Sequence, residues 1–147
     1  MDKLKSYLQA QHIDFELINH EKPIRTAKEG VQHLGVAIEQ TAPTFIVKTK
    51  QAYYGLIVSG SRGRINLDEV ASILGVAELQ FADPDDVLEV TGFKVGTVPL
   101  LLNLPCLFDT RLLQYDYIYG GTGELTTTLK ISPHHVEKLN DVIAYLV

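Results

Sequence analysis

The sequence predicts a single α+β domain, residues 1–147, with a mixed β-sheet or a barrel-like sheet flanked by helices. Helical and strand patterns are interleaved without the regular βαβ rhythm of a doubly wound fold. Two capping boxes, at Thr26 and Asn66, mark helix starts in this interleaved pattern. No linker, internal repeat or low-complexity segment divides the 147 residues, a length that suits one domain.

The first third of the chain predicts a helix, a strand and a second helix. Leu4 and Leu8 form an apolar stripe at helical spacing from Asp2 to about Gln11. The alternating segment "DFELI" then predicts a strand. Thr26, followed three residues later by a glutamate, begins a helix, which a glycine at position 35 ends.

The middle of the chain predicts a hairpin and two more helices. "TFIVKT" and "YYGLIVS" are β-rich runs joined by a short polar turn, and the first should lie in the interior of a sheet. Asn66 begins a helix that ends at Gly75, and "ELQFA" predicts a short strand. Asp83, with a proline at the first helical position, begins a helix that reaches about Val90.

The last third predicts three strands and a final helix. The strands are "CLFD", "YDYIY" and "LTTTLKI", with a glycine turn before the last of them. Ser132 then caps a helix with proline at its first position, and we expect that helix to continue through Leu146, because its apolar residues fall on one face.

Charge is spread unevenly along the chain, whose net charge is −5. Residues 22–64 hold seven basic and two acidic side chains, a net of +5, whereas residues 65–147 have a net of −8. A basic segment in an acidic chain suits a small anionic ligand or the tip of a nucleic acid. It does not suit a protein that coats long duplexes. A chance cluster of solvated charges explains the same numbers equally well.

Composition also bears on the compartment. No apolar run approaches the roughly 20 residues that span a bilayer, and no export signal is visible. With Cys106 the single cysteine, no internal disulfide can form. We therefore expect a cytoplasmic protein without a membrane partner.

Metal and nucleophile chemistry find little support in the sequence. The five histidines are not paired at metal-binding spacing, and there is no cysteine cluster. Cys106 lies among apolar residues and is expected to be a buried, inert thiol. No nucleophile elbow or phosphate-binding glycine loop is present. We therefore expect no metal and no cofactor.

The segment "VGTVP" offers backbone chemistry instead. Gly96 leaves its own amide and those of Thr97 and Val98 unhindered, and Pro99 stiffens the exit from the loop. Such a loop can direct several N–H donors at one carbonyl or hydroxyl oxygen, as in an oxyanion hole.

The order of six segments along the chain resembles the YbaK-type domain. These segments are "TAKEGVQHLGV", "TFIVK", "LDEVASILG", "FADPDDVLEVTGFKVGTVP", "LFDTRLL" and "YGGTGELTTTLKISPHHVEKL". These domains are free-standing relatives of the editing domain of bacterial prolyl-tRNA synthetases. The resemblance runs from about Thr26 to the C-terminus. It implies hydrolysis of the ester between a wrong amino acid, commonly cysteine or alanine, and proline tRNA. Because that ester is already activated, positioning and electrostatic stabilisation can suffice without a protein nucleophile.

Two signature positions depart from that family. Where relatives begin the strand with lysine, this chain has Pro43, and the expected loop proline and the glycine after it fall at Leu100 and Leu102. Lys48 and Lys50 follow on the same strand. Because side chains alternate along a strand, we expect both to face away from the side of position 43 unless a bulge intervenes. "DYIYGGTG" lacks the histidine of alanine-editing branches, so the chain resembles the YbaK branch more.

The resemblance and the residues lead to two hypotheses. In the first, the domain binds the aminoacylated 3′ end of a tRNA, with prolyl-tRNA synthetase as an expected partner, and deacylation stays open because the lysine is absent. In the second, it is a non-catalytic binding module that lost the chemistry. We expect the site to be lined by Thr26, Pro43, Gly96, Thr97, Val98, Pro99, Gly120 and Gly121. We expect phosphates to meet Arg25, Lys28, Arg62 and Arg64.

Overall fold

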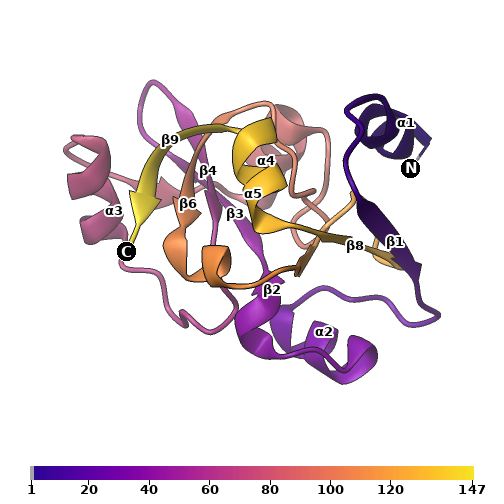
Figure 1. Cartoon of the computed structure of the whole chain (residues 1–147). Coiled ribbons are helices and arrows are strands. Elements are labelled where there is room, and N and C mark those ends of the chain that lie inside the picture. The colour runs from indigo at the N-terminus through magenta and orange to yellow at the C-terminus, as the bar shows by residue number, and fades with distance from the viewer. Residues whose placement is uncertain (1) are drawn as a thin grey trace.

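Helices and strands are interleaved along the chain, as the sequence patterns predict (Figure 1). The computed structural model describes residues 2–147. In chain order the elements are α1 (Asp2–Ala10), β1 (Phe15–Asn19), α2 (Ala27–Leu34), η1 (Ile38–Gln40), β2 (Thr41–Ala42), β3 (Thr44–Lys48), β4 (Tyr53–Ile57), α3 (Leu67–Leu74), β5 (Gln80–Phe81), α4 (Pro84–Thr91), β6 (Pro105–Asp109), η2 (Thr110–Gln114), β7 (Ile118–Gly120), β8 (Thr127–Ile131), α5 (Pro133–Leu139) and β9 (Asp141–Leu146).

Helices begin at the predicted N-caps because each cap side chain accepts a hydrogen bond from a backbone amide of the first turn. Thr26 accepts from the amide of Glu29 at 3.1 Å, and Asn66 accepts from two amides of α3. Asp83 and Ser132 do the same for α4 and α5, each with proline in the first turn. α2 and α3 end at Gly35 and Gly75, which adopt the left-handed conformation that glycine favours.

The strands form two mixed sheets. The first has the order β1-β8-β7-β2, with β2 parallel to β7 and the other pairs antiparallel. The second has the order β5-β3-β4-β6-β9, with β4, β6 and β9 parallel to one another and the β3–β4 hairpin antiparallel. β3, the "TFIVK" strand, lies inside this second sheet beside the two-residue strand β5. The α+β class with mixed sheets is confirmed.

The sheets do not close into a barrel in the part of the chain that the structure describes, so the barrel-like alternative is wrong. Pro43 separates β2, in the first sheet, from β3, in the second. Proline has no N–H to donate to a ladder, so a change of sheet at this residue leaves no amide unpaired.

A continuous apolar core joins the two sheets. Ile118, Leu129 and Ile131 of the first sheet pack in one cluster with Ile57 and Phe108 of the second. A second cluster covers the opposite face of β4 and β6, where Leu56 and Leu107 meet Val70 of α3. Because neighbouring residues on a strand face opposite sides, β6 serves both clusters at once.

The predicted extension of the last helix to Leu146 is wrong. α5 ends at Leu139, and the chain continues as β9, which pairs parallel with β6. Asn140 turns the chain at this point, since its side chain donates to the carbonyls of Leu100 (2.8 Å) and Val136 (2.9 Å) and accepts from the amide of Leu102 (2.8 Å). The apolar residues after position 140 fit a helical face, but the open edge of β6 binds them as a strand.

Candidate functional site

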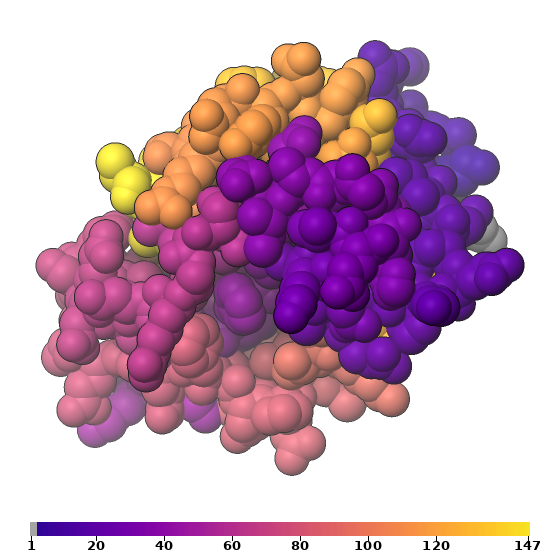
Figure 2. Space-filling view, turned by 90° about the horizontal axis from the view of Figure 1, so that it is seen from below, coloured from indigo at the N-terminus to yellow at the C-terminus, as the bar shows by residue number. Residues whose placement is uncertain are grey.

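A cavity of about 330 Å³ opens between the two sheets and α2. Figure 2 shows the surface hollowed there, where the purple segment around α2, the magenta loop after β4 and the salmon loop before β6 meet. Six separate stretches of chain line it: residues 24–34, 41–45, 58–63, 95–98, 119–124 and 127–128 contribute side chains or backbone. The lining is mainly small and apolar, with hydroxyl groups from threonine and serine.

Pro43 lies in the wall of this cavity. Its carbonyl accepts a hydrogen bond from the amide of Val58 at 3.1 Å, which holds the start of β3 against the end of β4. The ring carries neither charge nor donor. The cavity therefore has an uncharged wall at the position where the resemblance places an ammonium group.

Lys48 does not supply the missing charge to the cavity. Its Nζ lies 2.6 Å from Oδ2 of Asp86 on α4, and it is not among the lining residues. The hydrogen bond that the Lys48 amine donates to Asp86 raises the pKa of Lys48 above its usual value, so the amine stays protonated. Lys50 is exposed in the turn that follows β3 and does not line the cavity either. Neither lysine lines the cavity that Pro43 borders, and the expectation that both face away from position 43 stays a prediction.

The loop that contains "VGTVP" forms one edge of the cavity. Residues 94–97 make a turn in which the amide of Thr97 donates to the carbonyl of Lys94 at 3.0 Å. Gly96, with φ of +88°, occupies the position of that turn where glycine is favoured. Because the amide of Thr97 is held within the turn, the amides of Gly96 and Val98 are the better candidates for contact with a ligand.

The loop packs against the adjacent glycines Gly120 and Gly121 of "YGGTG". A side chain at Gly120 would overlap Leu100, and one at Gly121 would overlap the carbonyl of Val98. The amide of Leu100 donates to the carbonyl of Gly121 at 3.1 Å. Glycine is therefore needed at both positions for the loop to pack this closely against β7.

The start of α2 forms the opposite edge. Arg25, Thr26 and Ala27 line the cavity, and the capping box keeps this turn rigid: the amide of Arg25 donates to the side chain of Glu29 at 3.2 Å. The hydroxyl oxygen of Thr26 accepts the amide hydrogen of Glu29. Its own hydrogen can still be donated to a ligand.

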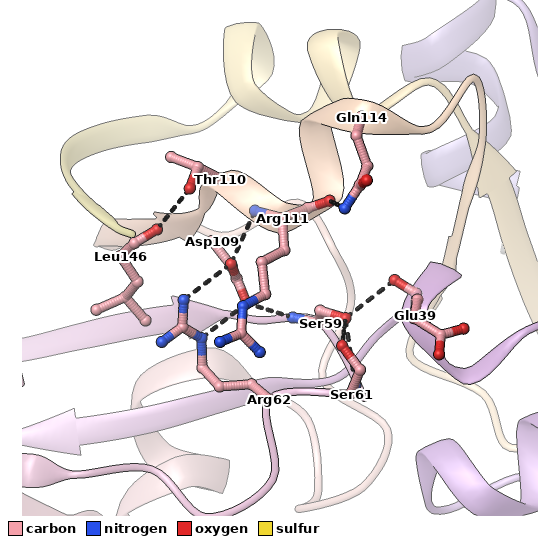
Figure 3. Close-up of polar contacts among 9 residues, drawn as sticks. All are labelled: Glu39, Ser59, Ser61, Arg62, Asp109, Thr110, Arg111, Gln114 and Leu146. Carbon is pink, nitrogen blue, oxygen red and sulfur yellow. Dashed lines mark hydrogen bonds and ion pairs between the residues drawn. The ribbon is translucent and has the colours of Figure 1, made fainter.

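A buried ion pair anchors the loop after β4, whose residues Ser59, Gly60 and Gly63 line the cavity (Figure 3). Asp109, at the end of β6, is fully buried and accepts from Nε and Nη2 of Arg62 and from the amides of Ser59 and Arg111, all at 2.9–3.0 Å. Burial alone would raise the pKa of Asp109, but these donors outweigh it and hold the pKa below its usual value.

Several hydroxyl-bearing residues of the cavity were not predicted from the sequence, and Thr44 and Thr128 are two of them. Oγ1 of Thr44 is buried and has no hydrogen-bond partner among residues 2–147. Oγ1 of Thr128 lies 3.0 Å from Nε2 of His20, whose Nδ1 lies 2.7 Å from the carbonyl of Lys22. That carbonyl can only accept, so the neutral ring carries its hydrogen on Nδ1 and Thr128 donates to Nε2. Their β-strand positions gave no sign that these side chains face a cavity.

The structure brings most of the predicted site residues together. Arg25, Thr26, Pro43, Gly96, Thr97, Val98, Gly120 and Gly121 line the cavity. Pro99 is buried and does not line the cavity, and Lys28 and Arg64 are exposed outside the lining. Arg62 is held by Asp109. The roles given to all of these residues remain predictions.

The described residues offer little for metal binding or for cysteine nucleophile chemistry. Within residues 2–147, no group of three or more histidine, cysteine, aspartate or glutamate side chains could hold a metal ion. Burial raises the pKa of the Cys106 thiol to about 12, as expected for an unreactive cysteine. None of the helices in the described residues has the length and apolar character to cross a membrane.

Comparison with known proteins finds a matching family and similar curated sequences. The aminoacyl-tRNA editing domain family matches residues 21–139. Among curated relatives, the proline–tRNA ligase of Thermosipho melanesiensis is 34% identical over 105 residues, which is 69% of this chain and 18% of the ligase. That of Thermoanaerobacter sp. (strain X514) is 37% identical over 122 residues, 80% of this chain and 20% of the ligase. The chain thus spans about a fifth of the length of these ligases.

Two solved structures have folds similar to that of this chain. A hypothetical protein, APE2540, is 27% identical and superposes with a TM-score of 0.88, covering 97% of each chain. The crystal structure of a "putative trans-editing enzyme for prolyl tRNA synthetase" is 26% identical, with a TM-score of 0.84 over 97% of this chain and 92% of the other.

Proposed function

This chain belongs to the aminoacyl-tRNA editing domain family, and from that premise we propose that its cavity receives the aminoacylated 3′ end of a mischarged proline tRNA. The observation that carries the proposal is the meeting of Thr26, Gly96 and Gly120 in one cavity that Pro43 also borders. A volume of about 330 Å³ is at the lower end of the usual range for ligand pockets. It suits a small amino acid, alanine or cysteine, on its ribose.

The reaction would be hydrolysis of the aminoacyl ester. Water adds to the carbonyl carbon, the bond to the ribose oxygen breaks, and the products are the free amino acid and a tRNA with its 3′-terminal hydroxyl restored. The amides of Gly96 and Val98 would bind the oxyanion that develops on the carbonyl oxygen. No side chain of this wall supplies an ammonium group, because position 43 is proline and Lys48 is paired with Asp86.

We propose that the wild-type protein therefore binds the mischarged end but hydrolyses the ester slowly. The second candidate, a binding module without catalysis, is favoured by the same proline. In either case residues 1–147 would act as one domain, since β1 and β9, near the two ends, are both built into the sheets. The partner that generates the substrate would be prolyl-tRNA synthetase, and both would act in the cytoplasm.

Single-turnover deacylation of Ala-tRNA and Cys-tRNA for proline tests the proposal. Loss of one preorganised donor typically costs ~10²–10³ in rate. Pro43→Lys should therefore raise the rate by at least about tenfold, a gain set below that range because Leu100 also departs from the family loop. Wild-type protein should be near the buffer rate.

Lys48→Met is the matched control, because it removes the nearest ammonium on the same strand. In both the wild type and the Pro43→Lys protein, this substitution should change the deacylation rate by less than about twofold. Loss of a catalytic donor would lower the rate far more. Rapid hydrolysis by wild type that Lys48→Met abolishes would overturn the assignment of Lys48 to a structural ion pair. No gain in a well-folded Pro43→Lys protein would favour the binding module.

A further inference from the structure

A second cavity of about 270 Å³ adjoins the first. The two share Thr44, Phe45, Val95, Gly96 and Val98 in their walls. Its remaining lining consists of the apolar side chains of Ile46 in β3, Phe81 in β5, Ala82 directly after β5 and Val87 in α4, and the lining includes no charged residue. The two cavities therefore differ in chemistry: the first is lined by hydroxyl groups, Arg25 and Glu124, and the second is apolar apart from Thr44 in the shared wall.

Two aromatic rings stand at this second cavity with much of their surface in solvent. Phe45 of β3 and Phe81 of β5 are 40% and 46% exposed, and their ring centroids lie 6.1 Å apart in an edge-to-face arrangement. Val95, in the wall between the cavities, is 57% exposed. A contiguous apolar patch of this kind, next to a site, is typical of a surface that a ligand covers.

We propose that this second cavity holds the terminal nucleobase of the tRNA, stacked on the ring of Phe81, which lines this cavity and not the first. The inference rests on the proposed function. In an aminoacyl-tRNA the amino acid is esterified to the terminal ribose, and the terminal base is attached to the opposite side of the same ribose. With the amino acid in the first cavity and the ribose at the shared wall, the base reaches the second.

The chemistry of the second cavity fits a base better than it fits the rest of the RNA. A base presents an apolar π-face, and aromatic side chains are the groups on which single-stranded bases stack. Phosphates would find no cation in this lining. The hydroxyl of Thr44, which has no hydrogen-bond partner among residues 2–147, stands in the wall shared by both cavities, where a ribose hydroxyl could meet it.

The test compares RNA binding with and without the terminal base, and with and without the Phe81 ring. The probe is an acceptor-stem RNA ending in CCA, with alanine on the 3′ ribose through a nonhydrolysable amide. A second RNA keeps that ribose and alanine but has no base on the last nucleotide. Affinities of both are measured for the wild type, Phe81→Ala and Phe81→Leu. The leucine variant keeps apolar volume in case alanine impairs folding. Tyr7→Ala is the control, since Tyr7 on α1 is an aromatic side chain with the same 46% exposure outside both cavities.

Removal of the base should weaken binding by the wild type and Tyr7→Ala by about tenfold, within the range for one stacked base. It should change binding by the Phe81 variants less than about threefold, because the ring on which the base stacks is already gone. If the wild type binds both RNAs equally well, the base lies elsewhere and this inference fails while the proposed function stands. If the wild type binds neither RNA, the proposed function fails and this inference fails with it.

Discussion

The carboxylate of Asp109 holds the guanidinium of Arg62 in a bidentate ion pair, with Nε 2.9 Å from Oδ2 and Nη2 3.0 Å from Oδ1. Asp109 ends β6, and Arg62 belongs to the loop after β4, so the pair fixes the cavity loop to the sheet (Figure 3). The amides of Ser59 and Arg111 complete the shell of donors around the carboxylate. This arrangement makes the loop part of the rigid frame of the site.

Asp109→Asn should lower the free energy of unfolding by about 3 kcal/mol, because removal of one partner leaves a largely buried guanidinium without its counter-charge. Urea denaturation followed by circular dichroism measures the effect. Glu16→Gln is the matched control, since the Glu16–Lys130 pair spans 3.7 Å and the glutamate side chain is 62% exposed. That change should cost less than about 1 kcal/mol. Equal costs for the two variants would contradict a structural role for the buried pair.

The contribution of Asp109 to stability should depend on pH. Its pKa in the folded protein is lowered by Arg62 and by two amides, so its contribution is complete above the unfolded value of about 3.9. The contribution is lost as pH falls through the lower folded value. The difference in unfolding free energy between wild type and Asp109→Asn should be constant from about pH 7 to 5 and shrink below about pH 4. A difference that stays flat to about pH 3 would mean that the pKa is not lowered.

Thr44→Val should separate binding from stability. The hydroxyl of Thr44 is buried without a hydrogen-bond partner in the described part of the chain, so its removal should leave the free energy of unfolding unchanged or raise it by up to about 1 kcal/mol. Affinity for the alanyl RNA should fall at least about fivefold, because the ligand loses one hydrogen bond. Thr41→Val is the control, since the hydroxyl of Thr41 lines the same cavity but already donates to the carbonyl of Ile38 at 2.7 Å. It should lose about 1 kcal/mol of stability. Unchanged RNA affinity in Thr44→Val would count against a ligand contact.

Arg25 and Lys28 should carry much of the salt dependence of RNA binding. Two of the seven basic residues between 22 and 64, Lys48 and Arg62, form ion pairs with Asp86 and Asp109, whereas Arg25 lines the cavity. The double change to alanine should lower affinity and flatten the log–log salt slope, which is about −0.7 for each phosphate contacted on a single strand. Lys3 and Lys5, exposed on α1, serve as the control pair for the same double change. An affinity of the wild type that does not change with salt would exclude these contacts.

Gly121→Ala should displace the loop that borders the cavity. A methyl group there would overlap the carbonyl oxygen of Val98, and a backbone atom cannot move without shifting its segment. A loss of about 1–3 kcal/mol of unfolding free energy is expected. Gly30→Ala, inside α2, meets only contacts at 3.8 Å and should be neutral or stabilise the protein by up to about 1 kcal/mol. Similar stabilities for the two variants would show that the loop adapts freely.

Features that depend on bonds between near neighbours could be predicted from the sequence alone. The starts of α2, α3, α4 and α5 were predicted because each cap bonds an amide only two or three residues away. The β3–β4 hairpin was predicted for the same reason, since a short turn joins its strands. The family resemblance, drawn from motifs in their order along the chain, is confirmed.

Only the tertiary structure decided features that depend on distant partners. The apolar residues after Asn140 fit a helix as well as a strand, and the edge of β6 determined that they form β9. Lys48 and Arg62 both carry a positive charge, and the sequence does not show which acidic residue either one pairs with. Lys48 is held by an aspartate 38 residues away, and Arg62 by an aspartate 47 residues away. The cavity likewise gathers six separate stretches of chain, and packing between the two sheets decides which of their side chains face it. Local hydrogen bonds are encoded within a few residues, whereas these contacts require the whole chain to fold first.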